Sequence, residues 1–201
     1  MFIIKEAYVT EEVLHMKKLL RMNVENFFVV FEGSDNLGKT TIAEVVCKQL
    51  NFQYTKFPNP NLYSGKVLRE ILQGKRPFEP AGFQALNIID RLLTPMQGHL
   101  IIDRYVDSGT IYGESDGLPR EWIDEMNSML VQPDLVFVFT GTPFSTDGEK
   151  YDNNEKIVQG YKRLLEENKD NPKYVEINAN RSIEEVANEI VSIITARCSN
   201  D

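Results

Sequence analysis

The chain has 201 residues, of which 42% are hydrophobic and 26% are charged, and its formal net charge is −8. These values are ordinary for a soluble globular protein, and the length favours one domain that buries its own core. The negative charge argues against general binding to nucleic acid or to an anionic membrane. It leaves room for a phosphate ligand, because a few local cations and backbone N–H groups are enough to bind one anion.

The cysteines and the apolar segments bear on the compartment. Two cysteines form no disulfide framework, which is typical of a reducing environment, so we expect the protein in the cytoplasm. No apolar run approaches the roughly 20 residues of a membrane span. The first residues, MFIIKEAYV, also lack the basic start and long apolar core of a secretion signal.

Residues 1–26 form an N-terminal extension ahead of the first predicted strand. The segment TEEVLHMKKLLRM predicts a helix that begins after Thr10 and has an apolar side. An additional helix packed on the domain is the simplest interpretation of this segment, and we favour it over a binding device.

From residue 27 onward, short apolar segments rich in β-branched and aromatic residues alternate with helical patterns. The predicted strands are 27–32, 52–57, 99–103, 134–140 and 173–177. Strands of this kind suit a parallel sheet that is covered on both faces, so we predict a three-layer α/β fold with five parallel strands. The last helix is the clearest, because Ser182 and Glu185 form a capping box ahead of an apolar stripe that ends at Ile194.

The segment GSDNLGKT at residues 33–40 follows the first predicted strand and opens a helix, and it fits G-x-x-x-x-G-K-[ST]. The glycines let successive N–H groups point at phosphate oxygens, and the start of the helix adds positive potential. Lys39 then reaches the terminal phosphates, and the Thr40 hydroxyl suits Mg²⁺. A glycine-rich turn without a ligand is the alternative. We predict a P-loop NTPase fold whose nucleotide-phosphate site comprises Gly33, Ser34, Asn36, Leu37, Gly38, Lys39, Thr40 and Thr41.

A second motif, LIIDRYVDSGTIYG, follows the predicted strand at 99–103. Polar residues at the carboxyl end of such a strand lie where open α/β sheets bind ligands. Asp103 can hold Mg²⁺ directly or through water, and Arg104 can bind a phosphate with two N–H groups. Without the P-loop, the same Asp–Arg pair would be interpreted as a surface ion pair.

The segments FEGSDNLGKTT, FPNP, DRYVDSG and PDLVFVF resemble thymidylate kinases in their order and spacing, over about residues 27 to 197. The resemblance implies a nucleoside monophosphate kinase domain at residues 27–201. It implies that ATP is the phosphoryl donor, that dTMP is converted to dTDP, and that Mg²⁺ is the cofactor. It also implies a homodimer formed through helices that flank the sheet.

The resemblance also implies roles at the acceptor site. A carboxylate inside a phosphate-binding loop needs another partner, and the resemblance assigns Asp35 to the 3′-hydroxyl of the acceptor. Arg104 is assigned to the acceptor phosphate and Arg91 to the pyrimidine O4. Phe57 is expected to pack against the base. The other positions expected at this site are Arg69, Ser108, Gly109 and Tyr112.

Two acceptor positions depart from the family pattern. The family places a base-stacking aromatic one helical turn before Arg91, where this chain has Asn87, and Phe83 is the alternative aromatic. Many members carry an arginine for the acceptor phosphate where this chain has Pro60, and we expect Arg69 to compensate. The identity of the base is therefore the open part of the prediction.

Residues 141–153, polar and glycine-containing, resemble the lid that closes over the phosphates and excludes water. The resemblance implies that Tyr151 packs beside C2′ of the sugar and disfavours ribose. Family members carry a catalytic arginine either in the lid or in the P-loop, where this chain has Lys150 and Asn36. We therefore predict Lys150 as the catalytic cation of the lid, acting with Lys39 and Arg104.

Adenine is expected at the loop after the last strand, with Ala179 and Arg181 as contacts. Several alternatives to a dTMP kinase stay open. One is a kinase for another or a modified pyrimidine deoxynucleotide, and a second is a deoxynucleoside kinase. A GTP-dependent switch protein would need N-K-x-D after a strand, whereas ENKDN at 167–171 has the wrong spacing and follows a helix. The last alternative is a nucleotide-binding protein with little or no catalytic activity, which stays open because the expected arginines are missing.

Overall fold

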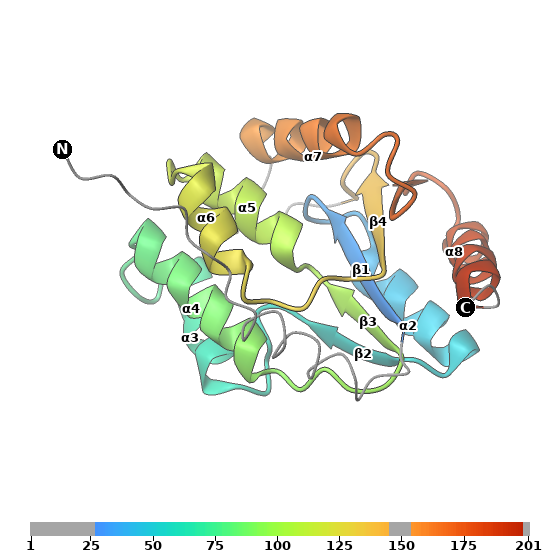
Figure 1. Cartoon of the computed structure of the whole chain (residues 1–201), viewed down its shortest axis with the longest axis horizontal. Coiled ribbons are helices and arrows are strands. Elements are labelled where there is room, and N and C mark those ends of the chain that lie inside the picture. The colour runs from blue at the N-terminus through green and yellow to red at the C-terminus, as the bar shows by residue number, and fades with distance from the viewer. Residues whose placement is uncertain (1–26, 145–153, 199–201) are drawn as a thin grey trace, which may run out of the picture.

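The structure is a computed structural model that describes residues 27–144 and 154–198. Within these residues, five parallel strands form a sheet in the order β2-β3-β1-β4-β5 (Figure 1). The strands are β1 (Phe28–Gly33), β2 (Gln53–Lys56), β3 (Leu100–Asp103), β4 (Leu135–Thr140) and β5 (Tyr174–Asn178). The five predicted strands are confirmed, and their ends differ from the sequence-based bounds by at most one residue.

Helices cover both faces of the sheet, as the three-layer prediction requires (Figure 1). The helices α2 (Lys39–Leu50) and α8 (Ile183–Cys198) pack on one face. The other face is covered by α5 (Val106–Ser115), α6 (Arg120–Asn127) and α7 (Glu155–Glu167). The helices α3 (Tyr63–Leu72) and α4 (Pro80–Leu93) lie beside the β2 edge.

The apolar runs of the strands are explained by burial on both faces. In β1, Val29 and Phe31 point into the core beneath α2 and α8, whereas Val30 points into the core beneath α5 and α7. All three side chains are at most 1% exposed. Each contributes roughly 1.5–3 kcal/mol relative to an exposed position, which accounts for the absence of polar alternation in this strand.

The capping predicted for the last helix is confirmed. The Ser182 N–H donates to Glu185 Oε2 at 3.0 Å, and the Glu185 N–H donates to Ser182 Oγ at 3.2 Å. The helix α4 has Pro80 in its first turn, where a missing N–H costs nothing, and it ends at Leu93 before Pro95. The helix predicted after Thr10 lies outside the described residues.

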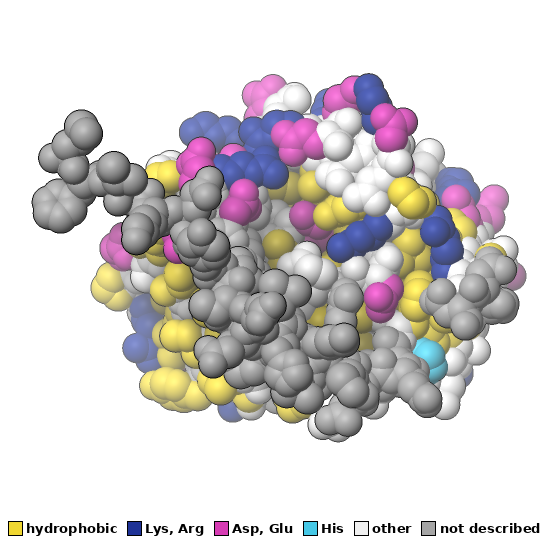
Figure 2. Space-filling model, viewed as in Figure 1, with side chains coloured by type: hydrophobic (Ala, Val, Ile, Leu, Met, Phe, Trp, Pro, Cys, Tyr) yellow, Lys and Arg dark blue, Asp and Glu magenta, His cyan; other side chains and the backbone are white. Residues whose placement is uncertain are grey.

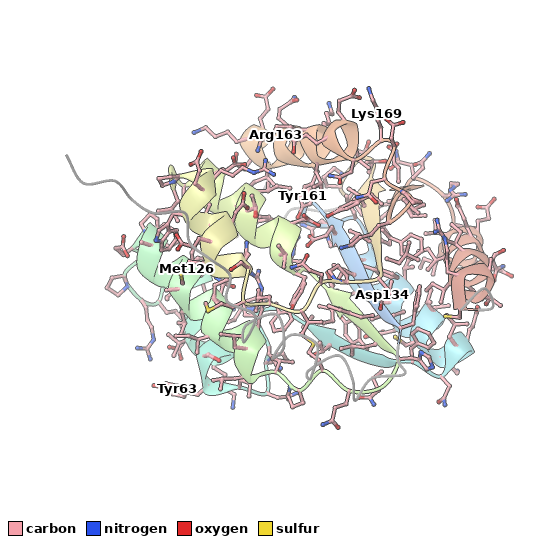
Figure 3. The ribbon with its side chains drawn as sticks, viewed as in Figure 1. Tyr63, Met126, Asp134, Tyr161, Arg163 and Lys169 are labelled. Carbon is pink, nitrogen blue, oxygen red and sulfur yellow. The ribbon has the colours of Figure 1, made fainter. Side chains whose placement is uncertain are left out.

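The helix α7 separates a buried side from a charged one. Tyr161 points inward toward α5, while Arg163 points outward, as does Lys169 just after the end of the helix (Figure 3). Figure 2 shows lysine, arginine and acidic side chains mixed over this part of the surface. Among the described helices, we find none with both the length and the apolar character needed to span a bilayer.

Candidate active site

The loop between β1 and α2 has the backbone shape of a phosphate-binding loop. Gly33 has φ 135°, and a Cβ at this position would lie 2.6 Å from the Phe139 carbonyl oxygen, so no larger residue fits. Gly38, with φ 75°, is the N-cap of α2. Lys39 is buried, and its Nζ donates to the Ser34 carbonyl at 2.6 Å. The lysine therefore already points back over the loop.

The charge of Lys39 is sensitive to its surroundings. Burial lowers the pKa of Lys39 to about 8, and the neighbouring Arg104 guanidinium acts in the same direction. The carboxylates of Asp103 and Asp35 oppose this shift. An anionic ligand in the loop would favour the charged form further, so the lysine is suited to binding phosphate.

The two predicted metal ligands are next to each other, because β1 and β3 pair in parallel and place Asp103 opposite Phe31. The Thr40 hydroxyl donates to Asp103 Oδ2 at 2.8 Å. The Oδ1 atom of Asp103 is buried and has no hydrogen-bond partner in the part of the chain that the structure describes. The described residues contain no cluster of three or more His, Cys, Asp or Glu side chains that could hold a metal alone. This pair fits Mg²⁺, which commonly takes one carboxylate and completes its shell with water and substrate phosphates.

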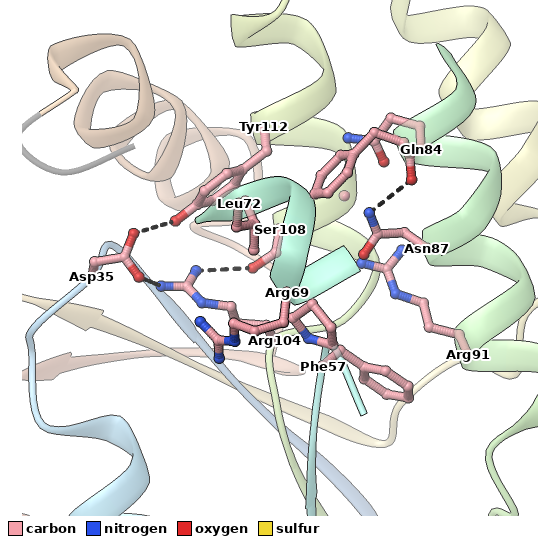
Figure 4. Close-up of a pocket in the computed structure, with 13 residues that line it drawn as sticks. Asp35, Phe57, Arg69, Leu72, Gln84, Asn87, Arg91, Arg104, Ser108 and Tyr112 are labelled. Carbon is pink, nitrogen blue, oxygen red and sulfur yellow. Dashed lines mark hydrogen bonds and ion pairs between the residues drawn. The ribbon is translucent and has the colours of Figure 1, made fainter. Parts of the chain in front are cut away.

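Arg104 and Asp35 form an ion pair at the centre of the site (Figure 4). Arg104 Nη2 donates to Asp35 Oδ1 at 2.6 Å, and the Tyr112 hydroxyl donates to Asp35 Oδ2 at 3.1 Å. Burial by itself would raise the pKa of Asp35, but Arg104 and Lys39 outweigh it, so the pKa lies below its usual value. Asp35 is therefore a carboxylate and can accept a hydrogen bond from a hydroxyl donor.

Glu32 is a site residue that the sequence analysis missed. It is fully buried at the end of β1, and its Oε1 accepts the N–H groups of Tyr105 at 2.9 Å and Ser108 at 3.1 Å. Its Oε2 accepts the hydroxyls of Ser108 and Tyr161. These bonds fix the start of α5 directly after Arg104, whose φ of 68° is unusual for a residue with a side chain. A glutamate inside an apolar strand was the available signal.

A pocket of about 700 Å³, partly open to solvent, lies between α3, α4, α5 and the loop after β2 (Figure 4). Its walls combine aromatic rings with buried polar groups. They include Phe57, Leu72, Phe83, Gln84, Asn87, Arg91, Ser108, Gly109 and Tyr112. We call it the acceptor pocket. A second cavity of about 820 Å³ lies over the P-loop and shares Asp35, Phe57, Arg69 and Arg104 with the first.

The Arg91 side chain is enclosed by its neighbours, but two of its donor nitrogen atoms make no hydrogen bond to the described residues. The guanidinium lies 6.0 Å from the centre of the Phe57 ring and 5.7 Å from that of Tyr105. A Cβ on Gly109 would lie 2.7 Å from Arg91 Nη1, so glycine makes room for the side chain. Among the described residues, the buried Nε and Nη1 atoms find no hydrogen-bond partner. Burial lowers the pKa of Arg91, yet the group stays cationic.

Asp90 was also missed, and it fixes the loop after β2. It is fully buried, and its Oδ2 accepts the Asn59 N–H at 2.7 Å while its Oδ1 accepts the Ser64 hydroxyl at 2.6 Å. These bonds join the loop, α3 and α4. Phe57 is thereby positioned against the pocket. Sequence reasoning had no partner to assign to this carboxylate.

The structure brings most of the predicted acceptor and phosphate residues together. The predicted residues that line the acceptor pocket are Asp35, Phe57, Arg69, Arg91, Arg104, Ser108, Gly109 and Tyr112. Those that line the P-loop cavity include Asn36, Leu37, Gly38, Lys39, Thr40 and Asp103. Lys56, which the sequence analysis did not single out, also lines this cavity.

Other predicted residues lie elsewhere. Ala179 is 2% exposed within the core beneath α2 and α8, and Arg181 pairs with Glu189 on the surface. Neither lines the two cavities described above, so their contact with adenine stays a prediction. Lys150 and Tyr151 lie outside the described residues.

Comparison with known proteins gives one family. Residues 31–190 match the family model described as thymidylate kinase. A protein of Methanococcus maripaludis named "Probable thymidylate kinase" is 32% identical over 192 residues, covering 84% of this chain and 95% of the relative. A thymidylate kinase of Dictyostelium discoideum is 27% identical, covering 83% of each chain. The solved structure of thymidylate kinase from Candida albicans shares the fold, with a TM-score of 0.70 at 19% identity, and the match covers 88% of this chain and 94% of that one. The chain belongs to the thymidylate kinase family.

Proposed function

We propose that the protein transfers the γ-phosphoryl group of ATP to dTMP, with Mg²⁺, and releases ADP and dTDP. The observation that carries this proposal is that the P-loop cavity and the acceptor pocket meet at Asp35, Arg69 and Arg104. A donor held by the P-loop and an acceptor held in the pocket would have their phosphates at this junction. The names of the relatives support dTMP as the acceptor.

On this proposal, positioning and charge neutralisation provide most of the catalysis. An oxygen of the acceptor phosphate attacks the γ-phosphorus, and the bond from that phosphorus to the oxygen bridging it to the β-phosphate breaks. The acceptor phosphate is already anionic near neutral pH, so no general base has to remove a proton. This is the main mechanistic difference from a deoxynucleoside kinase, whose acceptor is a hydroxyl group.

Each charged group of the site has a role in this scheme. The P-loop N–H groups and Lys39 bind the donor phosphates. Thr40 and Asp103 would hold Mg²⁺, which neutralises charge on the transferred group. Arg104 and Arg69 bind the acceptor phosphate, and Asp35 accepts the 3′-hydroxyl. Because Asp35 and Arg104 pair with each other in this structure, acceptor binding must exchange that contact for two new ones.

The remaining parts of the proposal rest on sequence. Lys150 supplies the lid cation, and Tyr151 excludes ribose. Ala179 and Arg181 contact the adenine.

We also propose a cytoplasmic homodimer. Exposed apolar side chains on α4, namely Ile89, Leu92 and Leu93, support a subunit contact, and Figure 2 shows hydrophobic side chains gathered over α3 and α4. Cys47 and Cys198 are not joined by a disulfide bond in the described residues, which supports a reducing compartment.

A panel of acceptors tests the proposed reaction. With ATP and Mg²⁺, we expect dTMP to be phosphorylated and thymidine to be inert. The other acceptors are dUMP, 5-substituted dUMPs, dCMP and dGMP. Faster use of a 5-substituted dUMP than of dTMP would identify the second candidate, a kinase for a modified pyrimidine, which Asn87 keeps open. Turnover of thymidine would contradict the mechanism, and binding without turnover of any acceptor would contradict the activity.

A further inference from the structure

Asn87 occupies the position where the family pattern expects a stacking aromatic, and its amide has a fixed orientation. The side chain is 8% exposed and lines the acceptor pocket. Its Nδ2 donates to the Phe83 carbonyl oxygen at 2.9 Å. A backbone carbonyl can only accept hydrogen bonds, so the nitrogen of the amide must face it. The oxygen is therefore the atom that Asn87 presents to the pocket.

The oxygen of Asn87 lies beside the unpaired donors of Arg91. The two residues are four apart on α4, so their side chains share one face of the helix. Figure 4 shows the Asn87 amide with its oxygen on the side of Arg91. Within the described residues, Asn87 Oδ1 has no hydrogen-bond partner, and neither do Arg91 Nε and Nη1. Asn87 thus presents a fixed acceptor to the pocket on the same helix face as Arg91, whose Nε and Nη1 donors are buried.

We propose that Asn87 is a specificity-determining residue that reads the acceptor base: its Oδ1 accepts the N3–H of a 4-oxo pyrimidine, next to the C4 carbonyl that Arg91 binds. This inference rests on the proposed function and names the substrate class of its acceptor site. In-plane hydrogen bonds at the base edge take the place of stacking at this position. Stacking is left to the rings of Phe57 and Phe83, which also line the pocket.

The arrangement matches uracil and thymine and opposes cytosine. Both 4-oxo bases present a donor at N3 beside an acceptor at C4, which complements Asn87 and Arg91. Cytosine reverses both groups, because its N3 is an acceptor and its C4 carries an amino donor. In the same pose, two acceptors would face each other at Asn87 and two donors at Arg91. A desolvated site of this kind rejects the wrong partner strongly, because its buried polar groups would be left unpaired.

The test compares dUMP with dCMP, which differ only at C4 and N3, in the wild type and in Asn87→Leu. Leucine has a similar branched shape but no acceptor. The Phe83 carbonyl keeps its helical N–H partner, so the variant is expected to fold. For the wild type we expect kcat/KM to favour dUMP by at least about 100-fold. In Asn87→Leu, dUMP loses a hydrogen bond and dCMP is relieved of a repulsive contact. The ratio of kcat/KM for dUMP to that for dCMP should therefore fall by about tenfold. Dissociation constants of both nucleotides, measured by calorimetry without ATP, should show the same change.

Thr94→Val is the matched control. Thr94 is the C-cap of α4, and its hydroxyl donates to the Asp90 carbonyl at 2.8 Å in an i to i−4 contact and accepts the Asn59 Nδ2–H at 2.9 Å, but Thr94 does not line the pocket. We expect its dUMP-to-dCMP ratio to equal that of the wild type even if its melting temperature falls. If Asn87→Leu proves unstable, Asn87→Ala removes the same acceptor without adding volume.

The outcomes separate this inference from the proposed function. A ratio unchanged within twofold in both Asn87 variants, with wild-type kinase activity intact, would overturn the role of Asn87 alone. Equal loss of both substrates would show that the residue is only structural. Absence of phosphorylation of dTMP and dUMP by the wild-type enzyme would instead overturn the proposed function.

Discussion

The phosphate end and the base end of the site differ in how their cationic side chains are paired. At the phosphate end, Lys39 contacts the Ser34 carbonyl and Arg104 contacts Asp35. At the base end, the buried Nε and Nη1 atoms of Arg91 have no partner within residues 27–144 and 154–198. A phosphate must therefore displace contacts that the protein already makes, whereas a base completes contacts that are missing. We therefore expect the charge of the ligand to determine affinity at the phosphate end. At the base end, we expect affinity to depend on how well hydrogen-bond donors and acceptors match.

The largest expected effect is at the phosphate end. Lys39→Ala should reduce phosphoryl transfer by at least about 100-fold, because the lysine neutralises charge that grows in the transition state. Steady-state kinetics with ATP and dTMP measure the loss, and circular dichroism checks that the protein stays folded. Turnover within a few fold of wild type in a folded variant would remove the kinase assignment.

A matched pair of substitutions tests whether the two ends contribute differently to the free energy of unfolding. Arg91→Met removes a buried cation whose donors are unpaired, so the ligand-free protein should gain about 1 kcal/mol. The same change should weaken dTMP binding by about 10- to 100-fold. Arg104→Met should instead lose about 1–2 kcal/mol of stability, because it leaves the Asp35 carboxylate without its counter-ion. Urea unfolding measures the change in the free energy of unfolding for each variant. Changes of the same sign in the two variants would contradict the proposed difference in pairing.

Asp35 lies where the two ends meet, and its effect should be smaller. If it accepts the 3′-hydroxyl, 3′-deoxy-dTMP should bind the wild type about tenfold more weakly than dTMP. In Asp35→Asn the penalty should shrink to about two- to threefold, since a neutral acceptor makes a weaker bond. Competition assays give the ratio within each variant, so the accompanying loss of the Arg104 contact cancels. An unchanged ratio would make Asp35 purely a partner of Arg104.

A further prediction concerns pH. Lys39, with a pKa of about 8, is cationic below that pH and loses its charge as the pH rises above it. The kcat/KM for ATP should therefore fall roughly tenfold between pH 7 and pH 9. The kcat itself should fall less, because bound phosphates stabilise the charged lysine. Parallel decline of both parameters would indicate that another group controls the profile.

The sequence predicted the phosphate end better than the base end, and the reason is locality. The P-loop is one continuous segment, and the roles of its glycines and its lysine depend on the local backbone conformation. Residues 33–40 were therefore sufficient to predict it. The base end is assembled from α3, α4, α5 and the loop after β2. Arg91 and Phe57 were placed there only through a family resemblance.

The missed residues share a physical cause. Glu32 and Asp90 are buried carboxylates whose partners are backbone N–H groups and hydroxyls of distant segments. Such partners are fixed by tertiary packing and leave no periodic pattern. For the fold, by contrast, strand pattern and capping residues were enough, because the three central strands β1, β3 and β4 are apolar over most of their length.

The buried Lys39 also has a thermodynamic consequence for nucleotide binding. Near pH 8 about half of the free protein lacks a proton on this lysine, since its pKa is about 8. A triphosphate that restores the charge must draw that proton from solution, so binding and proton uptake are linked. The heat of ATP binding should then differ between buffers of high and low ionisation enthalpy at pH 8, and the difference should vanish near pH 6.5 in Mg²⁺-saturated conditions. Nucleotide binding to this loop would therefore be accompanied by proton uptake from the solvent, which restores the positive charge on Lys39.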